Sequence, residues 1–151
     1  MTSPSPSNPS GIAAPGRTAG IVTIAASALS VLFMFHHPTG HGGGGLNMAS
    51  GVHAGMMVWL TAIFLGLVVH TARRGFSYLG TAAMVSYALG LVGHIGAATV
   101  SGFLMARLAA NVDPEASHDL FVLAMVTNRV LAELAVAATS IAFVLWAADM
   151  L

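Results

Sequence analysis

Four apolar runs of membrane-spanning length constrain the fold of this chain more than any other feature. Short polar or glycine-rich segments separate them, and the runs cover residues 18–35, 52–72, 76–105 and 119–151. A helix needs about 20 apolar residues to cross a hydrocarbon core of about 30 Å. Helices and closed barrels are the structures that satisfy every backbone hydrogen-bonding group in lipid. The pattern therefore predicts an all-α integral membrane protein, arranged as an antiparallel four-helix bundle.

Charge is too scarce for a water-exposed surface. Charged residues make up 7% of the chain and hydrophobic residues 56%, whereas about a quarter of the residues in soluble domains are charged. We therefore expect contact with the lipid bilayer over much of the surface. The five basic residues are scattered arginines, which excludes nucleic acid as a partner because phosphate binding needs clustered cations. The absence of cysteine excludes thiolate chemistry and disulfides.

The N-terminal segment differs in composition from the rest. Residues 1–16 are rich in proline and serine and lack apolar periodicity, which predicts a disordered tail before a four-span membrane domain at 17–151. Arg17 precedes the first run and Arg73-Arg74 follow the second. The positive-inside rule then predicts that both termini are cytoplasmic. In a bacterium, this would be a multi-pass protein of the inner membrane.

Small and polar residues at spacings of three and four predict the faces through which the runs associate. In the third run these residues are Ser86, Gly90, Gly93, His94, Ala97 and Ser101. In the fourth run they are Arg129, Glu133, Ala137 and Ser140.

A buried polar network is expected where two of these faces meet. Arg129 and Glu133 are four residues apart, so they share a helix face. His94 in the third run is expected at a similar depth, which predicts a contact among His94, Arg129 and Glu133. The network would mark a proton path or a ligand site, because charge inside a membrane is costly. An ordinary surface or bundle-locking ion pair is the alternative.

A histidine- and glycine-rich loop, residues 36–53, separates the first two runs. Its imidazoles suit zinc or copper. The loop between the third and fourth runs is expected on the same membrane face and adds a further histidine, His118. The predicted ligands are His36, His37, His41, His53 and His118. Pro38 and Gly40 oppose a helix, so no rigid i,i+4 histidine pair forms there. The alternative is a set of interfacial histidines that cap helix ends and bind water or headgroups.

Haem b held between two helices is another candidate cofactor for these histidines. His53 and His70 are excluded as its two axial ligands, because seventeen residues of helix separate them by about 25 Å.

No catalytic motif stands out. The chain has neither a lysine-containing phosphate loop nor a Gly-x-Ser-x-Gly nucleophile elbow. The sequence favours a non-enzymatic accessory or small-solute-binding membrane unit whose outer histidine loop is the interaction surface. Two alternatives stay open, a histidine-ligated metal- or haem-binding redox module and an oligomeric transporter of protons or small solutes. A second copy or a membrane subunit would be the protein partner.

Overall fold

The computed structural model describes residues 14–35, 46–113 and 115–151, and these residues form helices without a strand. Helix α1 is Ala14–Phe35, α2 is Leu46–Arg74 and α3 is Tyr78–Thr99. A five-residue π-helical segment, η1 (Val100–Leu104), continues α3 into the short helix α4 (Met105–Asn111), and α5 is His118–Asp149.

Three of the described helical stretches are long and apolar enough to cross a membrane. They are Met48–Arg74, Tyr78–Asn111 and His118–Asp149, and a shorter apolar stretch, Gly20–Leu32, lies in α1. Large hydrophobic side chains such as Leu123, Val130 and Val144 are exposed on the outside of α5. Such side chains are consistent with contact to lipid.

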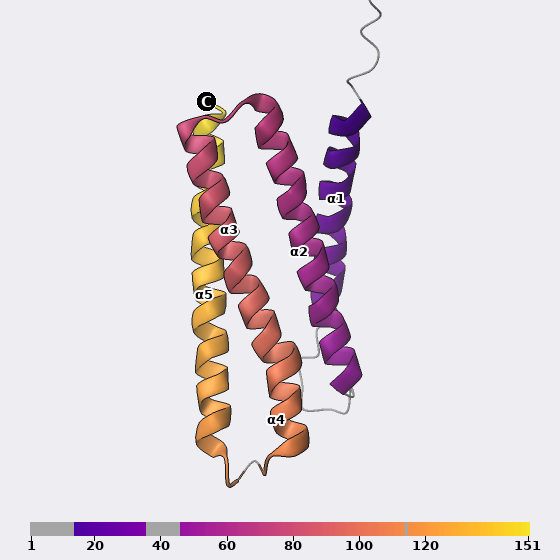
Figure 1. Ribbon diagram of the computed structural model, residues 1–151, viewed down its shortest axis with the longest axis vertical. Coiled ribbons are helices and arrows are strands. Elements are labelled where there is room, and N and C mark those ends of the chain that lie inside the picture. The colour runs from indigo at the N-terminus through magenta and orange to yellow at the C-terminus, as the bar shows by residue number, and fades with distance from the viewer. Residues whose placement is uncertain (1–13, 36–45, 114) are drawn as a thin grey trace, which may run out of the picture.

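The helices lie in an open row in the order α1, α2, α3, α5 (Figure 1). α1 packs on α2, and α5 packs on α3 with its continuation through η1 and α4. Among the described residues, no Cα atom of α2 lies within 8 Å of one in α5, and the same holds between α1 and α5. The described helices therefore form an open layer, whereas in the compact form of a four-helix bundle each helix has two neighbours.

Glycine accounts for the closest contact, that between α3 and α5. A Cβ atom at Gly93 would lie 2.9 Å from the carbonyl oxygen of Leu131, and Gly90 is similarly close to Ala135 and Thr139. Ala135 is fully buried at this contact. Because only glycine allows the two backbones to approach so closely, Gly90 and Gly93 lie on the packed face, as their spacing predicts.

The side of the fourth run that was predicted to pack against the other helices is exposed in the structure. Ala124, Ala135 and Ala142 are the buried residues of α5, whereas all four residues predicted to face inward are exposed, namely Arg129, Glu133, Ala137 and Ser140. At about 100° per residue, the two sets lie on opposite sides of the helix. Gly90 and Gly93 of α3 leave room for the small side chain of Ala135. Small side chains therefore determine which face of α5 packs on α3.

Helix boundaries also differ from the predicted ones. α2 begins at Leu46, which places His53 inside the helix, not at its start. The helical path that begins with α3 extends to Asn111 through the π-helical turn. α1 begins at Ala14, and the predicted tail otherwise falls in residues 1–13, outside the described residues.

The layer has two ends that differ in structure (Figure 1). We call the end that holds residues 73–78 and the C-terminal turn of α5 the Arg74 end. The opposite end, which holds the start of α2, η1, α4 and the start of α5, is the π end.

Candidate functional site

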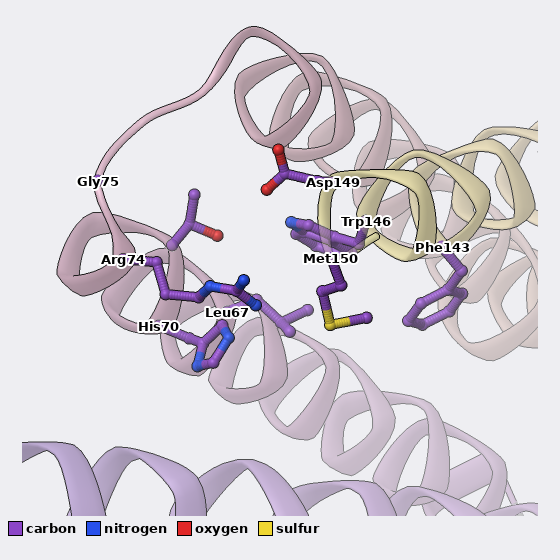
Figure 2. Close-up of a pocket in the computed structure, with 9 residues that line it drawn as sticks. Leu67, His70, Arg74, Gly75, Phe143, Trp146, Asp149 and Met150 are labelled. Atoms are coloured by element: carbon purple, nitrogen blue, oxygen red, sulfur yellow. The ribbon is translucent and has the colours of Figure 1, made fainter.

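A pocket of about 210 Å³ opens between α2 and α5 at the Arg74 end (Figure 2). We call it the α2–α5 pocket. Its walls are largely apolar with a few charged or polar groups, and the lining residues are Leu67, His70, Thr71, Arg74, Gly75, Phe143, Trp146, Asp149 and Met150.

Aromatic packing connects the three helices around this pocket. Tyr87 of α3 is buried, and its ring stacks on Phe64 of α2 with centroids 5.9 Å apart. The same ring contacts Phe143 and Trp146 of α5 at centroid distances of 6.1 and 5.8 Å. Aromatic contacts of this kind stabilise beyond the area that they bury. The cluster therefore joins α2 to α5 through side chains although their backbones stay apart, and two of its rings form a pocket wall.

The turn after α2 places the positively charged side chain of Arg74 at the pocket. Gly75 has a φ of +87°, a conformation that glycine adopts without strain, so the chain reverses directly after Arg74. In Figure 2 the guanidinium of Arg74 extends into the pocket beside His70 and Leu67. Within the described part of the chain, Arg74 forms no salt bridge.

The carboxylate that lines the pocket, that of Asp149, forms a hydrogen bond outside it. Asp149 accepts a hydrogen bond from the hydroxyl of Ser77. Ser77 is also the N-cap of α3, because its Oγ accepts the backbone N–H of Gly80 at 2.8 Å. This chain of hydrogen bonds holds the end of α5 against the start of α3. The pocket therefore combines a cation directed inward with a carboxylate held by a serine.

A second hollow lies on the other side of α2, against α1. It measures about 490 Å³, and its lining residues are Gly20, Thr23, Ile24, Gly66, Leu67, Val69, His70 and Arg73. His70 and Leu67 line both spaces. The two adjacent arginines thus belong to different hollows, which makes Arg73 a natural control for Arg74.

The π end is closed where the Arg74 end is open. His53 is buried, and its Nδ1 lies 2.7 Å from the carbonyl oxygen of Ala49. A Cβ atom at Gly102, in η1, would lie 2.5 Å from the Cβ of His53. The hydroxyl of Ser50 donates to the carbonyl oxygen of Gly102 at 2.7 Å. A π-helical turn, which often marks a functional position, here presents a carbonyl and a glycine to α2.

The predicted metal ligands are only partly placed. His36, His37 and His41 lie outside the described residues. His53 is packed against Gly102, and His118 is exposed as the first residue of α5. Residues 14–35, 46–113 and 115–151 contain no group of three or more histidine or acidic residues suited to a metal ion. The metal site stays a prediction that depends on the loop.

The predicted polar network is only partly assembled. Arg129 Nε donates to Glu133 Oε1 at 2.8 Å, and the two side chains are 81% and 63% exposed. His94 is half-buried on α3. In the described part of the chain it forms no hydrogen bond or ion pair with either residue. The pair forms as its spacing predicts, but it faces away from the other helices instead of being buried among them.

Sequence reasoning missed most of the α2–α5 pocket. From the sequence, Arg74 indicates only the topology, and neither Trp146 nor Asp149 is predicted as a site residue. A signal was present, because the predicted topology puts the end of the second run and the end of the fourth on the same membrane face. Comparison with protein-family models, curated proteins and solved structures finds no match for this chain.

Proposed function

We propose that this chain is an integral membrane protein of a bacterial inner membrane, with antiparallel spans and both termini cytoplasmic. The length and apolar character of three helices support insertion. Arg73, Arg74 and Trp146 line hollows at the Arg74 end, and Tyr78 is the first residue of α3 at the same end. Arginine on the cytoplasmic side and aromatic residues at the membrane interface are the usual arrangement. The Arg74 end is then the cytoplasmic face, and the α2–α5 pocket opens at headgroup level.

Within this placement, we propose that the protein is a non-enzymatic binding unit for an anionic amphiphile with a single acyl chain. The observation that carries the proposal is the Arg74 guanidinium, which extends into an apolar pocket and has no acidic partner among the described residues. A guanidinium binds carboxylate or phosphate through two parallel hydrogen bonds. Apolar walls strengthen such a contact because they lower the local dielectric constant.

The size of the pocket restricts the ligand. Its 210 Å³ is below the range of about 300–1,000 Å³ that is typical of sites for drug-sized molecules. The pocket therefore suits a small anionic head and the first methylene groups of one chain. Leu67, Phe143 and Met150 provide the apolar surface for these groups. The rest of the chain would extend into the surrounding lipid.

The test is calorimetric titration of dodecanoate into detergent-solubilised protein, with methyl dodecanoate as the uncharged ligand. We expect Arg74→Ala to weaken dodecanoate binding at least about tenfold, since a hydrogen bond to a charged group is worth about 1.5–3 kcal/mol. Arg73→Ala removes the same charge from the other side of α2 and should change binding less than about twofold. Equal losses in the two variants, or equal binding of the methyl ester, would contradict the proposal.

A further inference from the structure

The outward face of α5 carries charge that the other described helices do not cover. Between Asp119 and Asp149, the only charged residues are Arg129 and Glu133. Both lie on the side of α5 opposite Ala135, which packs on α3. The same exposed side continues through Ala137, Ser140 and Ala147. One stripe therefore combines an ion pair with small residues.

The depth of the pair follows from the membrane placement proposed above. If the cytoplasmic boundary lies at Trp146, Arg129 is seventeen residues away, about 25 Å along the helix. Glu133 is thirteen residues from the same boundary, about 20 Å. Both distances fall within a hydrocarbon core of about 30 Å. Charged side chains at such depths normally face protein or water instead of lipid.

The pair does not satisfy its own hydrogen-bonding groups. Arg129 uses its Nε in the bond to Glu133 Oε1, and a guanidinium has five N–H donors. The other four donors, and the second oxygen of Glu133, form no hydrogen bond within the described part of the chain. Lipid offers no partner for them. The face therefore requires a partner that supplies an acceptor for Arg129 and a donor for Glu133 within about one helical turn of each other.

We propose that this partner is a second copy of the chain, packed through α5 about a two-fold axis along the membrane normal. A copy inserted in the same orientation carries its own Arg129 and Glu133 at the same depth. The two-fold axis places like residues of the two copies at the same depth, and the long side chain of Arg129 can span the rise of about 6 Å to the Glu133 carboxylate of the other copy, so the patch is self-complementary. Ala137, Ser140 and Ala147 allow the two helices to approach closely. The α2–α5 pocket takes no part in this contact.

Cross-linking tests the contact without disturbing the charges. The chain has no cysteine, so Ser140→Cys places one thiol on the proposed face. Leu89→Cys is the matched control, because Leu89 is 58% exposed on α3 and neighbours Gly90, which contacts Thr139. A disulfide requires Cα atoms within about 7 Å of each other. We expect oxidation in vesicles to cross-link S140C into dimers and to leave L89C monomeric. Monomeric S140C, or equal dimer yields, would overturn the proposal.

Charge exchange between copies tests the pairing itself. R129E makes both positions acidic and E133R makes both basic, so each variant alone should lose at least about nine-tenths of the S140C dimer. Two differently tagged copies, one with R129E and one with E133R, should form a mixed dimer at close to the unmodified yield. An ion pair that acts only within one helix gives no such recovery. Dimer loss in the single variants without recovery in the mixture, or no loss at all, would overturn the pairing.

Discussion

The two ends of the helical layer use opposite means to place α2 beside its neighbours. At the π end, Gly102 lacks a side chain, and the ring of His53 fills the space that this leaves. At the Arg74 end, the rings of Tyr87 and Trp146 hold the helices apart, and a pocket stays open beside them. Glycine closes one end and aromatic residues keep the other open. The closed end is suited to rigidity and the open end to binding.

Gly102→Ala should produce the largest loss of stability. The added methyl group would lie 2.5 Å from the Cβ and 2.6 Å from the Cγ of His53. Overpacking of this kind costs about 1–3 kcal/mol, which reversible unfolding in detergent measures. The control is Gly51→Ala in the first turns of α2, where a Cβ meets nothing within 4 Å. That change should stabilise the helix by about 0.5–1 kcal/mol. Equal effects of the two substitutions would show that the π end is not tightly closed.

Energetic coupling between His53 and Gly102 tests whether the two residues are in direct contact at the π end. His53→Gly removes both the Cβ and the ring that a side chain at residue 102 would meet. Gly102→Ala should therefore cost less in the His53→Gly background than in the unmodified protein, with a coupling energy of about 0.5–3 kcal/mol. A double-mutant cycle on unfolding free energies measures this. Simple additivity would contradict a direct contact.

Ser77→Ala should have a moderate effect at the open end. It removes the N-cap of α3 and the hydrogen bond to Asp149 together. Loss of an N-cap costs about 1 kcal/mol, and Asp149 is then free to turn toward Arg74 across the pocket. We expect a loss of stability and weaker binding of dodecanoate in the same calorimetric titration. Thr81→Ala is the control, because among the described residues the Thr81 hydroxyl donates to the backbone carbonyl of Ser77 and the residue does not line the pocket, so the change should leave binding unchanged.

The helices were predictable because apolar runs and polar links follow from the requirements of lipid. Gly90 and Gly93 were predictable because small residues at helical spacing indicate a packed face. The packed face of α5 was not predictable, because alanine occurs on several sides of this helix and Ala135 and Ala142 are distinguished only by their contact with α3. The π-helical turn at residues 100–104 was not predictable, since the apolar run continues through it and Gly102 contacts His53, which is far away in the sequence.

The candidate site was harder to predict than the helices. Arg74 and Asp149 are far apart in the sequence, and they line one pocket because α2 and α5 both end there. The composition of the histidine loop indicates ligand types that suit a metal, but composition alone does not determine their geometry. Of the predicted metal ligands, His53 supports packing at the π end.

Quenching of Trp146 fluorescence tests the central claim, that the open end binds an anionic amphiphile, most directly. The chain has two tryptophans, so Trp59→Phe leaves Trp146 in the pocket wall as the only reporter. A fatty acid brominated near its carboxyl end should quench this fluorescence at saturable, micromolar concentrations. Arg74→Ala should shift the midpoint at least about tenfold, whereas Arg73→Ala should shift it less than about twofold. Quenching that is non-saturable, or that the loss of Arg74 leaves unchanged, would contradict the account.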